Sequence, residues 1–340
     1  MIKNLDGADF QRWNEFVENS EQATFFHRAE WKEVIDRAFN HKTHYLYSEK
    51  NGEIDGILPL VHVNSLLFGN SLVSTPFCVY GGIVANDQQA LADLDQQACQ
   101  LAEELHVDYL EMRNLQPSNR ADRQKKDLYV TFRKEMDPEV EKNLAAIPRK
   151  QRAMVRKGIK SGLISTIDQD IERFYRAYSE SVRNLGTPVF SKKYFQILKE
   201  VFKQQCEILT IEKDGVLIGS VMSFFHKDTV LPYYGGGTDQ ARLVKGNDFM
   251  YWEVMRRAVE KGIKIFDYGR SKKGTGSYSF KKHWGFEPEP LHYEYHMVRA
   301  DKLPDINPLN PKYQLFIAAW KKLPLTVSQA IGPWLSKDLG

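Results

Sequence analysis

Apolar positions in this chain follow a helical period and then a strand-like period, and the same order occurs twice. Phe26 precedes a helical apolar pattern that ends at Phe39, and Phe190 precedes a similar pattern that ends at Phe202, at a shift of 164 positions. Each pattern leads into alternating, β-branched or aromatic residues, which are typical of strands. The spacing therefore predicts paired helices followed by sheet in both halves of the chain.

A turn motif shows the repetition most directly. Glu49–Gly56 recurs 163 positions later as Glu212–Gly219, with strand-like residues on both sides of an Asn-Gly or an Asp-Gly pair. These dipeptides readily adopt the positive φ values of a two-residue turn, so each octamer predicts a β-hairpin. Farther along, the Tyr-Gly-Gly of 79–82 matches that of 233–236, and a helical pattern and a short strand follow each.

Both halves thus share one order: two helices, a hairpin, a strand, a helix and a strand. We interpret this as a duplicated α/β domain, because the shift is far longer than the period of a solenoid repeat. The predicted organisation is an N-terminal copy at 1–137, a basic linker helix at 138–162, a C-terminal catalytic copy at 163–300 and a helical appendix at 301–340. Two copies also predict a ligand-binding cleft between them.

The linker carries the densest positive charge in the chain. Pro148–Lys160 holds six basic residues and no acidic one. Arg149, Arg152 and Arg156 are the candidate anion-binding residues, since cations along ~20 Å of helix can hold a polyphosphate, a nucleic-acid backbone or a lipid phosphate. A solvated helix face explains the same composition equally well.

Composition sets the remaining limits. The 340 residues are 42% apolar with a net charge of +3, which indicates globular domains without a global attraction to polyanions. The three cysteines are widely spaced, so we expect neither a disulfide scaffold nor a metal site. The uncharged stretch 65–85 is interrupted by Asn, Pro and Gly-Gly and predicts buried strands rather than a membrane span. Without an apolar export signal, we expect a cytoplasmic protein.

The appendix has a short amphipathic pattern. Tyr313, Phe316, Ile317 and Trp320 share one helical face, and Lys321 and Lys322 follow them. We expect this face to pack on the second domain, while the aromatic and basic residues leave peripheral contact with a membrane open.

Phe266–Gly285 is the segment richest in candidate chemistry. Its first residues predict a strand end, where ligands usually bind in α/β sheets. Arg270, Lys272 and Lys273 then enter a glycine-rich loop, and Lys281 and Lys282 follow it. Free backbone N–H groups in such a loop can hold an anion or a polarised carbonyl, although an exposed turn has the same composition.

Other catalytic signatures are absent from the sequence. It contains no nucleophile elbow, zinc helix or dinucleotide fingerprint. The sequence therefore favours a reaction that requires few catalytic side chains. Acyl transfer from an ester or thioester to an amine is such a reaction, because the carrier supplies the leaving group and the protein positions the reactants.

Two motifs in this segment resemble a known family. Phe266–Ser271 and Phe280–Gly285 are similar to the FemAB family of peptidyl and aminoacyl transferases, which are tandem GNAT-like domains. The likeness is strongest to FemAB-like proteins associated with PEP-CTERM/exosortase systems in exopolysaccharide-producing bacteria. It covers nearly the whole chain, including Ile147–Met154 and Asn307–Tyr313.

The resemblance implies transfer of an amino acid from aminoacyl-tRNA to an amine of a cell-wall (peptidoglycan) precursor. The family's Phe-Lys pair matches Phe280–Lys281, which implies that Lys281 is the catalytic cation that stabilises the tetrahedral oxyanion, with Lys282 as its nearest competitor. The expected substrate contacts are Arg270, Ser271, Tyr234, Tyr278, Lys282 and Trp284.

The donor stays open between aminoacyl-tRNA and acyl-CoA. The pyrophosphate loop of GNAT enzymes appears only in degenerate form at Arg242–Asn247. Gly246 and Asn247 are candidate carrier-binding residues because they open a helix, whose N-terminus favours anions, whereas Asp248 in its first turn disfavours them.

No tightly bound cofactor is expected, and the acceptor is expected to be a small molecule or a lipid-linked glycan or peptide. Two alternatives remain: an acetyl-CoA-dependent N-acetyltransferase acting on an amino sugar or glycan precursor, and a non-catalytic protein that binds RNA or a polyprenyl phosphate.

Overall fold

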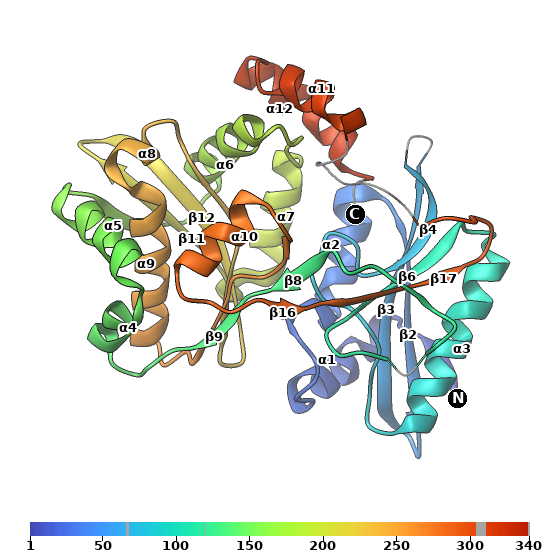
Figure 1. Cartoon of the computed structure of the whole chain (residues 1–340). Helices are drawn as coiled ribbons and strands as arrows, with labels where there is room; N and C mark the ends of the chain where they lie inside the picture. Colours follow the sequence, from blue (N-terminus) through green and yellow to red (C-terminus); the bar gives the residue numbers. More distant parts are fainter. Residues whose placement is uncertain (66–67, 119, 304–310, 339–340) are drawn as a thin grey trace. The chain divides into compact units, whose positions relative to one another are not determined.

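The computed structural model describes residues 1–65, 68–118, 120–303 and 311–338 and divides the chain into two compact units. Unit 1 comprises Met1–Tyr129, Pro290–Asp305 and Lys337–Gly340, and unit 2 comprises Val130–Glu289 and Ile306–Ser336. Each unit is a sheet covered by helices (Figure 1).

Unit 1 is built on a mixed sheet with the strand order β1-β2-β3-β4-β6-β17-β7, in which β5 also pairs with β3. One core cluster lies between this sheet and α3, around Leu58, Leu72 and Leu94, and α1 and α2 also bury large side chains, such as Trp13 and Trp31, beside the sheet. The elements are β1 (Ile2–Asn4), α1 (Phe10–Asn19), α2 (Glu30–Phe39), β2 (Lys42–Lys50), β3 (Glu53–Ser65), β4 (Gly69–Ser74), β5 (Val84–Ala85), α3 (Gln88–Glu104), β6 (Tyr109–Asn114), β7 (Gln124–Lys125) and β17 (His292–Met297).

Unit 2 has a second mixed sheet, with the order β10-β11-β12-β13-β14-β9. Its elements are β9 (Arg133–Glu135), α4 (Val140–Ala146), α5 (Arg149–Lys160), β10 (Ile164–Asp168), α6 (Glu172–Leu185), α7 (Lys192–Phe202), β11 (Cys206–Lys213), β12 (Val216–His226), β13 (Thr229–Gly237), α8 (Ala241–Val244), α9 (Gly246–Glu260), β14 (Ile265–Asp267), β15 (Ser271–Lys272), α10 (Gly276–His283), α11 (Pro311–Trp320) and α12 (Leu325–Ser336). The chain enters this unit within β8 (Tyr129–Thr131) and leaves it within β16 (Glu289–Pro290).

The predicted duplication is confirmed. Both hairpins, β2–β3 and β11–β12, turn through a residue pair with positive φ: Asn51 (54°) and Gly52 (85°) in unit 1, and Asp214 (49°) and Gly215 (76°) in unit 2. Each hairpin has a register shift at the equivalent place, after Ser48 and after Ile211. In each unit the third strand then pairs in parallel with the strand that follows the next helix.

One matched motif does not occupy equivalent positions. Tyr234–Gly236 lies within β13, whereas Tyr80–Gly82 lies in the irregular segment 75–83 between β4 and β5. Strand β3 pairs with Ser74 of β4 and then with Val84 of β5, while β12 pairs along β13 without such an excursion. In unit 1 the chain therefore leaves the sheet where unit 2 continues it.

The expected linker, 138–162, is part of unit 2 and forms two helices. They are separated at Ile147–Pro148, because proline has no backbone N–H to donate and restricts the residue before it to extended conformations. Val155 and Gly158 on α5 are buried, and α5 packs on α9.

The C-terminal part of the chain is shared between the units. Strand β17 falls within the range predicted for the second copy, yet it pairs antiparallel with β6 and belongs to unit 1. The predicted helical end is present as α11 and α12, both in unit 2. Of the Asn307–Tyr313 segment, residues 307–310 lie outside the described residues.

Helices cover both faces of the unit 2 sheet at β13. A Cβ atom on Gly236 would lie 2.6 Å from the Cβ of Ser181 on α6, and one on Gly235 would lie 2.9 Å from the hydroxyl of Tyr251 on α9. Successive residues of a strand face opposite sides of the sheet. The consecutive glycines therefore allow α6 and α9 to approach β13 closely from its two faces.

Candidate functional site

The candidate site lies where the pairing of β13 with β14 ends. Among the described residues, this parallel pairing joins only Thr229 to Ile265 and Val230 to Phe266. After β14 the chain continues through Tyr268–Arg270 into the glycine-rich loop, and Thr275 then caps α10 by accepting a hydrogen bond from the backbone N–H of Tyr278. The cap fixes the start of α10, which carries the Phe280–Lys281 pair.

Lys281 points from α10 back to the segment that follows β14. Its Nζ donates hydrogen bonds to the carbonyl oxygens of Tyr268 (2.8 Å), Gly269 (2.9 Å) and Arg270 (3.1 Å). It also lies over the Phe132 ring, 5.5 Å from the centroid. An ammonium group has three N–H donors, and here all three have main-chain acceptors.

The pKa of Lys281 is lowered to about 7, chiefly by burial; the Asp267 carboxylate raises it and nearby Arg270 lowers it within that net result. The side chain is only 8% exposed, so desolvation of the charge is the dominant cause. Near neutral pH this amine therefore exchanges between its charged and neutral forms. In this geometry Lys281 holds the backbone of 268–270, and the predicted direct bond to a substrate oxyanion requires one of the three carbonyls to be released.

Two hydroxyl groups in the same segment have no hydrogen-bond partner among the described residues. They are the Oγ of Ser271, which is 4% exposed, and the phenolic oxygen of Tyr268, which is 7% exposed. Burial raises the pKa of Tyr268 well above its usual value, so its hydroxyl remains a donor. An unpaired buried hydroxyl costs roughly 1–3 kcal/mol, which a ligand atom that accepts a hydrogen bond would recover.

The structure brings together some of the residues predicted from the sequence. Arg270 and Ser271 follow β14, and Tyr278 packs its ring on Phe132 at a centroid distance of 5.5 Å. Lys282 is exposed on α10 beside Lys281. Sequence reasoning did not single out Tyr268, although it lies inside the strand-end motif that drew attention.

Tyr234 and Trp284, predicted as substrate contacts, are both buried in unit 2. Tyr234 is buried on β13, where its hydroxyl is 2.8 Å from that of Tyr194 on α7. Trp284 is 0% exposed, and its Nε1 donates to Asp248 at 3.4 Å. Both side chains are large and aromatic, and the unit 2 core takes up their apolar surface.

The N-terminus of α9, predicted to bind a carrier anion, is occupied by the protein's own groups. A Cβ atom on Gly246 would lie 2.3 Å from Ile218, so the glycine serves close packing. Asn247 is exposed. Asp248 accepts hydrogen bonds from Gln151 and Trp284, and burial raises the pKa of its carboxyl. A carboxyl group in the first turn already uses the positive end of the helix dipole.

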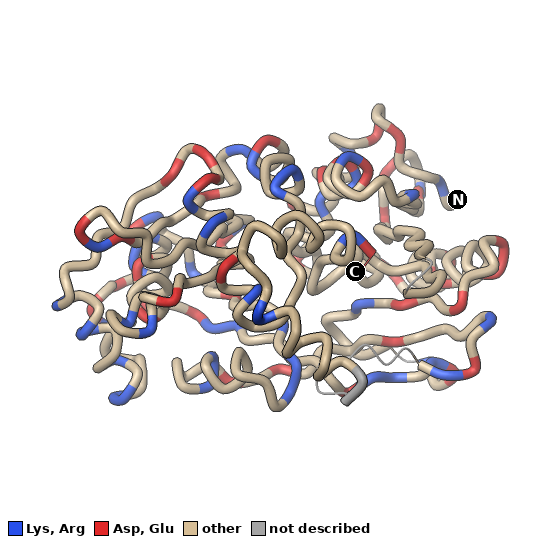
Figure 2. Tube along the Cα trace, turned by 90° about the horizontal axis from the view of Figure 1, so that it is seen from above, with Lys and Arg blue, Asp and Glu red and all other residues tan. Residues whose placement is uncertain are grey.

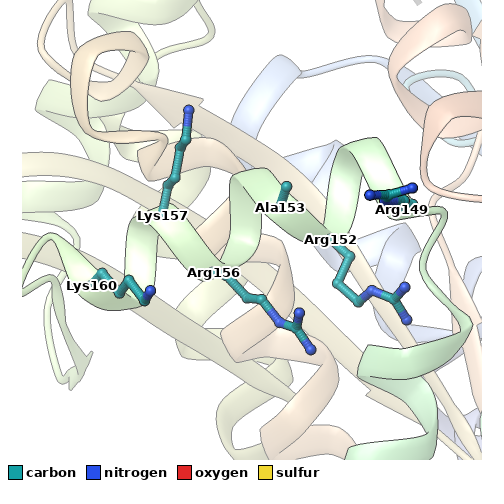
Figure 3. Close-up of a pocket in the computed structure, with 6 residues that line it drawn as sticks. All are labelled: Arg149, Arg152, Ala153, Arg156, Lys157 and Lys160. Carbon is teal, nitrogen blue, oxygen red and sulfur yellow. The ribbon is translucent and has the colours of Figure 1, made fainter.

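The basic residues of α5 form a separate candidate site. Its buried side, with Val155 and Gly158, faces α9, and the opposite side lines a hollow of about 290 Å³. Figure 3 shows Arg152 and Arg156 projecting to the same side of the helix. The hollow is lined by Arg149, Arg152, Ala153, Arg156, Lys157 and Lys160.

Most of these cations have no side-chain partner among the residues that the structure describes. Arg152 donates to the carbonyl of Ala145 at 2.6 Å. The side chains of Arg149, Arg156, Lys157 and Lys160 form no hydrogen bond or ion pair within the described parts of the chain. Lys157 and Lys160 were not singled out, although both also line the hollow. Elsewhere, acidic and basic residues are interspersed along both units (Figure 2). The α5 face is therefore a local positive surface.

The described residues were also searched for metal-binding clusters and for membrane-spanning helices. No three His, Cys, Asp or Glu side chains there gather in a way that could hold a metal ion. Among the helices described, none combines the length and apolarity needed to cross a membrane.

Comparison with known proteins gives a domain family and several similar structures. Residues 142–282 match the model of the acetyltransferase (GNAT) domain. The crystal structure of FemX is similar with a TM-score of 0.68 at 13% identity, over 93% of this chain and 100% of that one. A comparison with curated proteins gave no match.

Two further structures resemble the whole chain. A tandem GNAT protein from the clavulanic acid biosynthesis pathway has a TM-score of 0.58 at 10% identity, over 89% of this chain and 99% of that one. The C-terminal domain of a putative lysylphosphatidylglycerol synthetase from Agrobacterium fabrum also scores 0.58, at 15% identity, over 85% and 91%. Together with the internal duplication, these findings give the chain a FemAB-like fold of two tandem GNAT-like domains, with the GNAT match in the second.

Proposed function

We propose that this protein transfers an acyl or aminoacyl group from an activated carrier to an amine. The observation that carries the proposal is the GNAT match over 142–282, which contains the α5 face and the segment from β14 to Lys281 on α10. Within it, Lys281 supports the 268–270 backbone next to two buried hydroxyls that lack partners. A carbonyl oxygen that becomes negative during the reaction is the kind of acceptor these hydroxyls require.

We propose that the reaction proceeds in the following order. The acceptor nitrogen attacks the carrier-bound carbonyl carbon and forms a C–N bond and a tetrahedral oxyanion. Ser271 and Tyr268 donate hydrogen bonds to that oxygen, and Lys281 holds the segment that carries them. The bond from carbon to the carrier oxygen then breaks, and the proton lost by the amine passes to the departing hydroxyl. This assignment replaces direct oxyanion contact by Lys281 with a positioning role.

We propose aminoacyl-tRNA as the donor. The α5 face offers four cations without a partner in the described chain, at a spacing that suits a phosphate backbone. The N-terminus of α9, where a pyrophosphate would be expected to bind, already holds the buried Asp248. Arg149, Arg152 and Arg156 are therefore assigned to the carrier, together with Lys157 and Lys160, whereas Gly246 and Asn247 are not.

A second candidate is acetyl-CoA-dependent acetylation of an amino sugar or glycan precursor. The description of the matched domain as an acetyltransferase favours it. For either donor we propose an envelope or exopolysaccharide precursor as the acceptor, in the cytoplasm. A link to PEP-CTERM systems rests on the sequence resemblance alone.

A labelling experiment separates the donors. Purified protein is incubated with bulk bacterial tRNA charged with ¹⁴C amino acids, or with ¹⁴C acetyl-CoA, and an extract of envelope precursors as the acceptor source. Mild alkali hydrolyses the remaining esters and thioesters, so label that survives alkali measures amide formation. We expect stable label from aminoacyl-tRNA. Stable label from acetyl-CoA alone would support the second candidate, and stable label from neither would contradict acyl transfer.

The role of α5 is tested by filter binding of the same charged tRNA. Replacing Arg149 and Arg156 with Gln should weaken binding about tenfold near 0.1 M salt and reduce the slope of log K against log salt by about two. The matched control replaces Lys203 and Lys264, two exposed lysines of unit 2, with Gln. Equal effects of the two pairs would show that only net charge matters and would reject the α5 site. Binding without amide formation would favour the non-catalytic alternative.

A further inference from the structure

Helix α12 faces unit 2 with its small residues. Ser328, Gly332 and Ser336 repeat at helical spacing and are buried. A Cβ atom on Gly332 would lie 3.0 Å from the backbone nitrogen of Val189, and the Ser336 hydroxyl donates to the Val189 carbonyl at 3.1 Å. On an ordinary surface helix the large apolar side chains face the core. In α12 the small residues do so instead.

The large apolar side chains of α12 point outward. Val327 is 40% exposed, Ile331 43% and Trp334 64%. On α11, which contacts unit 2 through Ile317 at Gly186, Leu315 is 84% exposed and Phe316 43%. These five are among the twelve exposed large hydrophobic residues of the described chain, so two short helices hold a large share of them. An apolar surface of this kind marks a binding site.

Charge indicates what binds there. The sequence from 311 to 336 contains no Asp or Glu. Lys321 and Lys322 are both exposed in the turn that joins the two helices. Apolar and aromatic side chains next to cations, on two helices that contain no acidic residue, suit the interface of an anionic membrane. A protein partner would not require this exclusion of acidic residues.

We propose that the outer surface of α11 and α12, formed by Leu315, Phe316, Val327, Ile331 and Trp334, binds the surface of an anionic bilayer. The apolar side chains enter the boundary between headgroups and acyl chains, and Lys321 and Lys322 contact lipid phosphates.

This surface is distinct from the α5 face. Helix α12 packs on α6 and α5 packs on α9, and these two helices cover opposite faces of β13. A bilayer and a tRNA therefore do not compete for one surface, and a lipid-borne acceptor would be available to unit 2. The inference itself does not depend on acyl transfer.

Vesicle flotation tests the proposal without any substrate. The whole protein is mixed with vesicles of phosphatidylcholine alone or of an equimolar mixture of phosphatidylcholine and phosphatidylglycerol. We expect flotation with the mixed vesicles that weakens as salt is added. Replacing Ile331 and Trp334 with Ser should lower the affinity by at least ~tenfold, and replacing Lys321 and Lys322 with Gln by about tenfold.

Matched controls keep the test specific. Leu243→Ser removes a side chain of α8 that is 81% exposed, and Gln at Lys203 and Lys264 removes two charges outside the surface. Both control proteins should float like the wild type, and thermal unfolding should confirm that every variant is folded. Absence of flotation with the mixed vesicles would overturn the proposal, as would equal flotation of the Ile331/Trp334 variant. Light scattering that shows a dimer, lost in that variant, with no flotation would assign the surface to a second copy.

Discussion

Each unit has a buried cation near the end of the strand that pairs in parallel with its third strand, but the two cations come from different elements, β6 and α10, and have different partners. In unit 1, Arg113 near the end of β6 is 2% exposed and donates to the Glu111 carboxylate at 2.8 Å and to the Cys78 carbonyl at 2.7 Å. In unit 2, Lys281 donates to three carbonyls after β14 and has no carboxylate among these acceptors. The first cation is neutralised and fixed, whereas the second has a pKa of about 7.

The polar groups around the two cations also differ: those near Arg113 are paired, whereas some near Lys281 are not. In unit 1 the segment 75–83 leaves the sheet, its residues 77–80 are buried, and Arg113 binds its carbonyls. In unit 2 the strand β13 continues, and the unpaired hydroxyls of Tyr268 and Ser271 lie beyond β14. In unit 1 this region is filled by packed side chains. In unit 2 it contains polar groups without partners, so we expect the substrate to bind and react in unit 2.

The largest expected effect is on the stability of unit 1. Arg113→Met leaves the Glu111 carboxylate, 8% exposed, without its cation. Breaking a buried ion pair by removing one partner costs about 3–5 kcal/mol, so chemical denaturation should show a loss of this size. Amide formation per folded molecule should remain near the wild-type value. A loss of activity without a loss of stability would place catalysis in unit 1 and break the comparison.

The corresponding change in unit 2 should act mainly on activity. Lys281→Met removes the donor that holds three carbonyls, so we expect the rate of alkali-stable amide formation to fall by ~100-fold, with roughly 2 kcal/mol lost from the free energy of unfolding. Lys282→Met, one residue along and exposed, is the matched control and should retain most activity. Wild-type activity in the Lys281 variant would remove this residue from the mechanism.

The pH dependence of stability should also distinguish the two cations. Because the pKa of Lys281 is about 7 in the folded chain against an ordinary 10.5, unfolding takes up a proton between these values. The unfavourable contribution of this group is fully present below pH 7, and stability rises as the pH increases toward 10.5. The difference in unfolding free energy between the wild type and Lys281→Met should therefore grow from pH 7 to pH 10. Parallel curves would mean that the amine titrates normally.

Replacing one serine in each unit should have smaller effects, on activity in unit 2 and on stability in unit 1. Ser271→Ala removes a hydroxyl without a partner, so stability should stay unchanged or increase slightly, while amide formation falls by ~tenfold. In unit 1, the buried Ser74 hydroxyl accepts a hydrogen bond from the backbone N–H of Arg113 at 2.8 Å. Ser74→Ala should cost ~1–3 kcal/mol and leave activity intact. The reverse pattern would show that Ser271 is structural.

The sequence was sufficient for the features that depend on local signals. The Asn-Gly and Asp-Gly turns, the helical periods and the shared order of elements predicted the duplication, because positive φ and amphipathic spacing are encoded within a few residues. The carbonyl contacts of Lys281 could not be predicted, since they depend on how residues 11 to 13 positions earlier are folded back. The burial of Tyr234 and Trp284 could not be predicted either, because a sequence does not show which aromatic side chains the core encloses.

The same limit explains two further differences. The identical letters Tyr-Gly-Gly lie in a strand in one unit and outside the sheet in the other, because β5, not the motif, completes the pairing with β3. For α12, periodicity separates a small-residue side from an apolar side, but only the packing on α6 and Val189 shows which of them faces the protein. Tertiary contacts thus determine whether a motif lies in a strand and which side of a helix is buried, neither of which the local sequence pattern specifies.

The smallest expected effect tests whether the two hairpins are physically equivalent. Gly52 and Gly215 both have positive φ, and a Cβ atom on either would meet nothing within 4 Å. Alanine at each position is therefore strained by its backbone conformation alone and should cost ~1 kcal/mol. Chemical denaturation of the two single variants should show losses that agree within about 0.5 kcal/mol, with no change in activity. No contact at either site should alter the cost of the alanine. Clearly different losses in unfolding free energy would therefore show that the surrounding fold, and not the turn's own φ values, determines the stability of one hairpin. The two hairpins would then share a sequence motif but not its energetic contribution.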